Sequence, residues 1–167
     1  MSAIHTPPLS DKSGTASAAA LFTLIRESSW GGGLDDALLT MLLSHTHRQH
    51  VPQDTFVCTE GDPGEFMAFI VSGRLRVLKQ DYFKMEQCIA QLGAGDSFGE
   101  MALVDDNPRS ASIQAVEPTE LLVLPVETFR RLLTEQPSLA VALLSQVSRV
   151  LSQRVRYLNR RILERLT

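Results

Sequence analysis

The spacing of apolar positions divides the chain into helical ends and a β-rich middle. Near the start, residues 19–26 have the spacing of a short helix, and the three glycines at 31–33 interrupt it. A second stripe, of leucines, follows between residues 38 and 43, and Asp35 and Asp36 stand at its start. Acidic side chains stabilise the positive end of a helix, so the pattern predicts two helices before the middle of the chain.

Between residues 51 and 125 the period changes to short apolar runs, separated by glycine, aspartate or proline about every eight to twelve residues. This alternation is typical of antiparallel sandwiches and barrels. A single short helix is expected between the runs at residues 86–92 and 110–115. This interruption leaves one rim of the barrel open. The candidate strands are residues 55–58, 66–71, 75–79, 86–92, 110–115 and 120–124.

The C-terminal part of the chain is helical again. A helix is predicted over residues 126–134, and Pro137 suits the first turn of a long helix that runs to about residue 165. Apolar residues of this helix form a seam close to that of a coiled coil, with Ser148 as its weak position. Six arginines lie mostly off the seam, so we expect a partner helix on one side and solvent on the other. The seam residues are Leu144, Leu151, Val155, Leu158 and Ile162.

Length and composition indicate one ordinary globular domain. The chain has 167 residues, of which 44% are hydrophobic and 21% charged. No apolar run approaches the ~20 residues of a membrane span, and we expect no membrane partner. Residues 1–18 lack the apolar core of a signal peptide, which predicts a disordered tail and a cytoplasmic protein. Residues 19–136 and the helix at 137–167 are predicted to form a single domain.

Cysteine usage and charge exclude some classes of function. Cys58 and Cys88 are expected to be buried thiols, and two cysteines are too few for an iron–sulfur cluster. The net charge of -3 gives no general attraction to nucleic acid, so DNA binding would need a local basic patch.

The most informative stretch is residues 98–111, which read F-G-E-M-A-L-V-D-D-N-P-R-S-A. Gly99 allows close approach of the backbone, the short helix after it offers free N–H groups to an anion, and Arg109 supplies a fork of donors for phosphate. Glu100 would repel a phosphate unless it accepted a hydrogen bond from a neutral group such as a sugar hydroxyl. A phosphate and a ribose side by side indicate a nucleotide.

This stretch, together with turns at residues 60–64, 70–77 and 92–96, resembles the phosphate-binding cassette of the cyclic nucleotide-binding domain family. That family includes catabolite activator proteins, regulatory subunits of cyclic AMP-dependent kinase and gated channels. The resemblance extends from about residue 35 to the C-terminus. It implies an α+β fold, in which an antiparallel double-stranded β-helix, a jelly-roll-like β-roll, is flanked by N-terminal helices and a long C-terminal helix.

The resemblance also implies roles for individual residues. Arg109 would pair with the cyclic phosphate and Glu100 would accept from the ribose 2′-hydroxyl, while Gly99, Ser110 and Ala111 would donate backbone N–H groups. The rest of the predicted ligand-binding set is Phe98, Met101 and Ala102 from the cassette, Ile89 and Ala90 beside the purine, and Arg154 from the long helix.

Structural interpretations compete with several of these roles. Arg109 could form a surface ion pair with Asp105 or Asp106, and Glu100 could simply stabilise its helix. Ile89 and Ala90 could be core residues. Arg154 could stack on the base or belong to a solvated basic face.

Ser110 favours cyclic AMP, because threonine at this place goes with cyclic GMP in eukaryotic relatives. A metal site at His45, His47 and His50 is not expected, because no carboxylate or cysteine flanks them. Trp30, Met67 and Met85 are expected to be core or cover residues.

These observations favour a bacterial receptor for cyclic AMP, with cyclic GMP as the alternative ligand, that has no enzymatic activity. Ligand binding would move the C-terminal helix, through which we expect a homodimer, and a protein effector is a further candidate partner. A hydrolase would need a metal pair or an aimed base, and the cassette offers neither. The remaining alternatives are a ligand-independent or cyclic-dinucleotide-binding subunit and a DNA-associated regulator using the basic helix. DNA binding is not expected, because no helix-turn-helix module follows.

Overall fold

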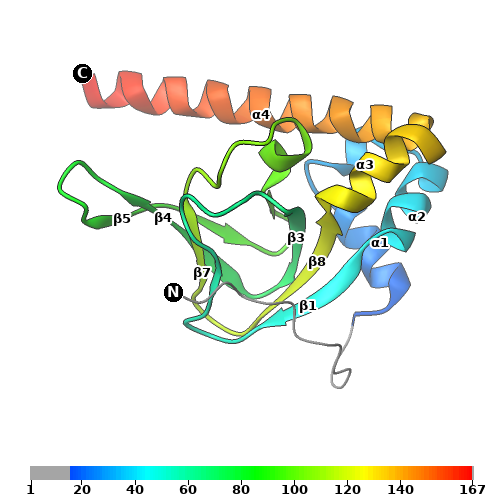
Figure 1. Cartoon of the computed structure of the whole chain (residues 1–167), viewed down its shortest axis with the longest axis horizontal. Helices are drawn as coiled ribbons and strands as arrows, with labels where there is room; N and C mark the ends of the chain where they lie inside the picture. Colours follow the sequence, from blue (N-terminus) through cyan, green and yellow to red (C-terminus); the bar gives the residue numbers. More distant parts are fainter. Residues whose placement is uncertain (1–15, 167) are drawn as a thin grey trace.

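The computed structural model describes residues 16–166, and Figure 1 shows their arrangement. The helices are α1 (Ala18–Glu27), η1 (Gly31–Gly33), α2 (Asp36–Ser44), η2 (Glu100–Leu103), α3 (Val126–Glu135) and α4 (Pro137–Leu166). The strands are β1 (His47–Val51), β2 (Phe56–Cys58), β3 (Phe66–Ser72), β4 (Arg74–Gln80), β5 (Glu86–Gly93), β6 (Ser97–Phe98), β7 (Ser112–Ala115) and β8 (Thr119–Pro125).

The strands form two antiparallel four-stranded sheets, in the orders β1-β8-β3-β6 and β2-β7-β4-β5. The two sheets face each other as a β-roll, with α1, α2 and α3 gathered at one end and α4 running along one side (Figure 1). The predicted α+β fold, a β-roll with flanking helices and a long C-terminal helix, is confirmed.

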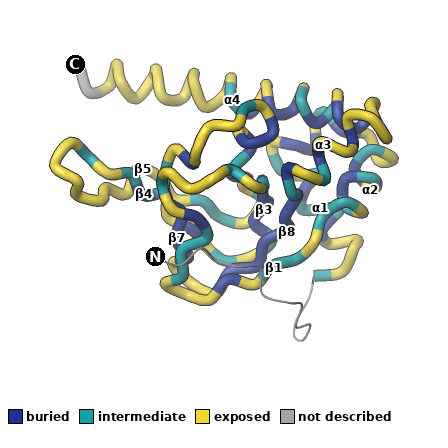
Figure 2. Tube along the Cα trace, in the orientation of Figure 1, coloured by how far each residue is buried: buried dark blue, intermediate teal, exposed yellow. Residues whose placement is uncertain are grey.

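Alternation along the strands gives the roll two separate apolar clusters, because successive side chains of a strand point to opposite faces. On β3, Ala68 and Ile70 belong to the cluster inside the roll, whereas Met67 and Phe69 pack against the helices. Figure 2 shows this buried layer as the dark blue segments of β3, β8 and the adjoining helices. Ala102 and Leu103 of η2, beside the site described below, belong to the helical cluster.

The helices begin where their sequences predict. Ser17 caps α1 by accepting a hydrogen bond from the backbone N–H of Ala20, and Asp35 caps α2 by accepting one from Leu38. Residues 1–15 of the predicted tail lie outside the described residues, and its last residues were predicted wrongly, because Ser17 caps α1 and Ala18 is the first residue of that helix. No helix within residues 16–166 is long and apolar enough to cross a membrane.

The connection between α1 and α2 is held between α4 and the roll by Trp30, which is fully buried. Its indole Nε1 donates to Ser97 Oγ at 2.9 Å, and its carbonyl accepts from Gln146 Nε2 at 2.9 Å. A Cβ on Gly33 would lie 1.6 Å from Gln146 Nε2, so glycine allows η1 to approach α4 this closely. The expected core positions of Trp30 and Met67 are confirmed.

The hairpin formed by β4 and β5 projects from the roll, and two predictions on it are wrong. Met85 is 63% exposed and Cys88 is also exposed, although we expected both to be covered. β5 is an edge strand that pairs only with β4, and residues 86–91 are exposed on both of its faces. Cys58, in contrast, is buried as expected.

Two strands were missing from the sequence interpretation. β1 reads HRQHV and is an edge strand of which only Val51 is buried, so it carries no apolar alternation. β6 has only two residues. The predicted strand at 110–115 starts later, at Ser112, because the preceding residues belong to the loop beside the cavity.

The first half of α4 packs against the domain, and the second half extends beyond it. Leu139, Leu143, Val147 and Val150 are buried, whereas residues 152–164 are all exposed. The distal half, together with the hairpin, overhangs the roll on the same side in Figure 1. The seam residues Val155, Leu158 and Ile162 are therefore exposed in a single copy of the chain, and their pairing with a partner helix stays a prediction.

Candidate functional site

A cavity of about 580 Å³ opens at the rim of the roll that faces the overhanging part of α4. Most of its lining comes from the cassette between Phe98 and Ala111, from β4 and β5, and from one face of α4. This volume is in the range of about 300–1,000 Å³ that is usual for small-molecule sites.

The cassette begins with a left-handed turn at Gly99, whose φ is +76°. A Cβ there would lie 2.4 Å from Arg109 Nη1 and 2.7 Å from the Phe66 carbonyl oxygen. Glycine is therefore required at this position for its conformation and for the space that it leaves to Arg109. η2 follows directly and places Glu100 in its first turn.

Arg109 lies across the base of the cavity with only 8% of its surface exposed. Its Nη2 donates to the Phe66 carbonyl at 2.8 Å, and its guanidinium carbon lies 4.5 Å from the centre of the Phe66 ring. Its Nε has no hydrogen-bond partner among the described residues. Among the described residues no carboxylate forms an ion pair with Arg109, and Asp106 pairs with Arg130. The cavity thus contains a buried cation with free donor capacity.

Glu100 is the most buried polar group of the cavity, with 1% of its surface exposed. Its Oε1 forms an ion pair with Nη1 of Arg154, and Nη2 of Arg154 donates to the Ser97 carbonyl at 2.7 Å. Its Oε2 has no partner among the described residues. A buried carboxylate oxygen without a hydrogen bond costs roughly 1–3 kcal/mol, so a donor supplied by a ligand would stabilise this arrangement.

Backbone and side-chain contacts hold the far end of the cassette in place. The N–H of Arg109 donates to the Asp62 carbonyl at 2.7 Å, and the N–H of Gly61 donates to the Arg109 carbonyl at 2.9 Å. Lys79 Nζ bridges the Glu60 carboxylate and the Ser110 carbonyl. The hydrogen bond from Lys79 lowers the pKa of the Glu60 carboxyl, and the backbone N–H of Gln80 adds to this effect.

The inner wall of the cavity is apolar and includes one thiol. Val77, Ile89 and Ala90 come from β4 and β5, and Cys58 comes from β2. Burial raises the pKa of the Cys58 thiol, and the positive charge of Arg109 offsets part of that rise. The thiol is therefore neutral near pH 7 and contributes to an apolar surface.

The structure brings all of the predicted site residues to this one cavity. They are Phe98, Gly99, Glu100, Met101, Ala102, Arg109, Ser110, Ala111, Ile89, Ala90 and Arg154. Their contact with a ligand stays a prediction. The alternative that Ile89 is a core residue does not hold, because its side chain is about half exposed.

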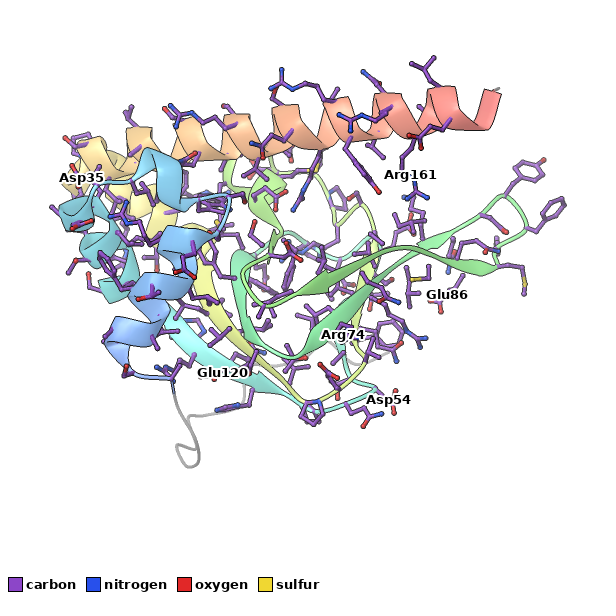
Figure 3. The ribbon with its side chains drawn as sticks, turned by 180° about the vertical axis from the view of Figure 1, so that it is seen from behind. Asp35, Asp54, Arg74, Glu86, Glu120 and Arg161 are labelled. Carbon is purple, nitrogen blue, oxygen red and sulfur yellow. The ribbon has the colours of Figure 1, made fainter. Side chains whose placement is uncertain are left out.

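The α4 wall differs from the sequence interpretation. Arg154, expected over a base, turns its guanidinium to Glu100 instead. Tyr157, Leu158 and Arg161 also line the cavity, and sequence reasoning missed them. They lie three, four and seven residues after Arg154 and therefore on the same face of the helix. This spacing is the sequence signal that could have identified them. In Figure 3, Arg161 extends from α4 toward the hairpin that carries Glu86.

The three histidines considered for a metal lie away from the cavity. His47 and His50 are on β1, and His45 follows α2, where its Nε2 lies 3.3 Å from Gln136 Oε1. Within residues 16–166, no three side chains of histidine, cysteine, aspartate or glutamate form a group that could hold a metal ion.

Comparisons with known proteins agree with this geometry. Residues 48–136 match the family described as the cyclic nucleotide-binding domain. A cyclic AMP receptor protein of Thermus thermophilus is 36% identical over 121 residues, which cover 72% of this chain and 56% of the relative. The chain thus spans little more than half the length of that relative.

Two solved structures extend the comparison to the fold. A cyclic nucleotide-binding domain from Methylobacillus flagellatus is 32% identical, with a TM-score of 0.78 over 88% of this chain and 83% of that one. The regulatory domain of a Toxoplasma gondii kinase, PKA, crystallised with cyclic AMP, is 29% identical, with a TM-score of 0.63 over 68% of this chain and 43% of that one.

Proposed function

Because this chain belongs to the cyclic nucleotide-binding domain family, we propose that its cavity is a receptor site for cyclic AMP and that the chain is not an enzyme. One observation carries the proposal. Arg109 Nε and Glu100 Oε2 are buried polar atoms without partners, and both side chains line the same cavity. A cyclic nucleotide offers an anion for the first and a sugar hydroxyl for the second.

The phosphate end of the ligand is assigned to Arg109 and the residues that follow it. A buried guanidinium and a phosphate form charge-assisted hydrogen bonds, which are about twice as strong as those between neutral groups. The backbone of Ser110 and Ala111 adds donors on the same side. The ribose 2′-hydroxyl then donates to Glu100, which completes the hydrogen bonding of that carboxylate.

Cyclic AMP rather than cyclic GMP is proposed on two grounds. The Thermus relative is named a cyclic AMP receptor, and the Toxoplasma kinase domain was crystallised with cyclic AMP. Ser110 stands where the family places threonine in cyclic GMP receptors. Cyclic GMP is the competing ligand, and the α4 wall contains Tyr157 and Arg161, which could bond to either purine.

The proposed output of binding is a change in the position of α4. Arg154 links this helix to Glu100, and the ligand needs the same carboxylate. A ligand can shift an equilibrium between two helix positions only by binding one of them more tightly. A ribose hydroxyl on Oε2 would hold Glu100 in place while Oε1 binds Arg154, so the helix position that forms this ion pair would bind the ligand more tightly.

The exposed seam of α4 supports a parallel homodimer. In heptad terms Val155 and Ile162 occupy a positions and Leu151 and Leu158 occupy d positions, and this choice favours two parallel strands. Arg154 falls at g, where a parallel partner would present Asn159 at e. The seam ends at Ile162, because the next d position is Arg165.

The cavity lining also supports a receptor rather than a hydrolase. It contains no histidine, and its buried carboxylate is already paired with arginine. Cytoplasmic location and bacterial origin stay predictions. Calorimetric titration of the full chain with cyclic AMP and cyclic GMP tests the proposal, followed by a search for hydrolysis products after long incubation. Absence of binding to both nucleotides would overturn it, and turnover would overturn the non-enzymatic part.

A further inference from the structure

The tip of the β4–β5 hairpin presents large apolar side chains to solvent. Tyr82 is 95% exposed, Phe83 is 80% exposed and Met85 is 63% exposed. The two rings contact each other edge to face, with centroids 5.6 Å apart. Neither ring contributes to the cavity or to an apolar cluster of the domain. Folding therefore does not account for aromatic residues at this position.

The turn that carries these side chains is held rigidly by Asp81. One carboxylate oxygen accepts from the backbone N–H groups of Phe83 and Met85, both at 2.9 Å, and the other accepts from Gln87 Nε2 at 3.1 Å. The backbone of Asp81 exchanges further hydrogen bonds with Lys84 and Met85. Because the turn is already ordered, binding through its tip costs little additional backbone entropy.

The same end of the molecule carries a concentration of positive charge. Between residues 149 and 161, α4 has five arginines and no acidic residue, while the whole chain has a net charge of -3. The rest of the chain is thus markedly acidic. The distal half of α4 and the hairpin overhang the roll on the same side, and residues 152–164 of α4 are exposed (Figures 1 and 2).

We propose that this end of the molecule docks on an anionic lipid surface, with Tyr82, Phe83 and Met85 entering the headgroup region and Arg156 and Arg160 of distal α4 binding lipid phosphates. Charge complementarity selects this partner: the basic end would face the lipid and the acidic remainder would face away. Aromatic side chains with one polar end partition favourably into the membrane interface. The expectation of no membrane partner rested on the absence of a membrane-spanning segment. Peripheral binding to a lipid surface needs no such segment.

Two other partners fit the observations less well. Duplex DNA would use the arginines but would leave the aromatic tip without a role. A second copy of the chain would use the α4 seam, which is a different face of the helix from Arg156 and Arg160. These two arginines are exposed and do not line the cavity, so the lipid proposal does not depend on cyclic AMP binding.

The test is sedimentation of the full chain with vesicles of phosphatidylcholine alone and of phosphatidylcholine mixed with phosphatidylglycerol. Binding is expected only to the anionic vesicles. The double variant Tyr82→Ala/Phe83→Ala should reduce it at least tenfold, and Arg156→Gln/Arg160→Gln should reduce it by about tenfold or more. Leu133→Ala and Arg131→Gln, exposed positions on α3, are the matched controls and should bind as the unmodified chain does.

Several results would overturn the proposal. These are no binding to either vesicle, equal binding to both, and tip variants that bind as well as the controls. Binding of random-sequence duplex DNA, without binding to any vesicle, would instead assign the basic face to nucleic acid. If the tip variants lost vesicle binding only because they changed the oligomeric state in analytical ultracentrifugation, the tip would belong to a contact between copies. Calorimetry with cyclic AMP on the same variants separates these outcomes from failure of the nucleotide site.

Discussion

Arg154 of α4 and Glu100 of the cassette form an ion pair at the cavity, in which the carboxylate is 1% exposed and the arginine side chain 44% exposed. The pair joins α4 to the carboxylate proposed to bind the ribose. Because the same arginine donates to the Ser97 carbonyl, and Ser97 Oγ accepts from Trp30, the contact also reaches the N-terminal helices. These contacts therefore connect Glu100, α4 and the segment between α1 and α2.

Removing the arginine should loosen the distal half of α4. We expect Arg154→Ala to cost about 1–3 kcal/mol of unfolding free energy, because it leaves the buried Glu100 carboxylate without its partner. Hydrogen–deuterium exchange should rise in α4 after Leu151. Arg156→Ala, an exposed arginine on another face of the same helix, is the control. Equal exchange in both variants would show that the pair does not hold the helix.

Gly99→Ala should damage the site in two separable ways. Alanine in this left-handed backbone conformation should lower the free energy of unfolding by about 1–3 kcal/mol. The new Cβ would also displace the Arg109 guanidinium. Gly95→Ala has a similar φ, +87°, but open space around the new Cβ, so it measures the backbone strain alone. Thermal unfolding and nucleotide titration of both variants give the two contributions. The account predicts that only the change at Gly99 impairs binding, and equal binding losses would contradict it.

The two cysteines should react at very different rates. Cys88 is exposed on β5, whereas Cys58 is buried and its thiol pKa is raised by burial. Iodoacetamide at pH 8 should therefore label Cys88 quickly and Cys58 only after denaturation, as peptide mass spectrometry can show. Comparable labelling of both in the folded chain would mean that the wall beside Arg109 is open to solvent.

The contact between Glu60 and Lys79 predicts a pH dependence at the far end of the cassette. The pKa of Glu60 is lower in the folded chain than in the unfolded chain, so its contribution is present above the ordinary glutamate pKa of about 4.3. That contribution is lost as the pH falls through the lowered value. The difference in Tm between the unmodified chain and Glu60→Gln should shrink from pH 6 to pH 3. A constant difference would show that the ion pair does not stabilise the fold.

Local signals in the sequence were sufficient for most of the fold and for the cassette. The acidic start of α2 at Asp35, the apolar runs of β3 and β8 and the glycine turns act through neighbouring residues, so they can be read from the chain. The spacing of Gly99, Glu100 and Arg109 placed these side chains at one cavity because a tight turn and a short helix connect them.

Features that depend on the packing of distant segments could not be predicted in the same way. The rotation of α4 on the roll decides that Arg154 meets Glu100 and that Tyr157 and Arg161 line the cavity, and no local pattern sets that rotation. Met85 and Cys88 look like core residues until β5 is known to be an edge strand. β1 has no apolar alternation, because its single buried side chain is at its end.

The most direct test of the central claim is calorimetric titration of cyclic AMP into the unmodified chain and the Arg109→Gln variant. Arg131→Gln on α3 is the matched control, and thermal unfolding checks that each variant is folded. The account predicts saturable binding to the unmodified chain and the control, with affinity lowered about 100-fold or more in Arg109→Gln, because a buried charge-assisted pair with the phosphate is lost. Equal affinity in a folded Arg109→Gln variant would contradict it.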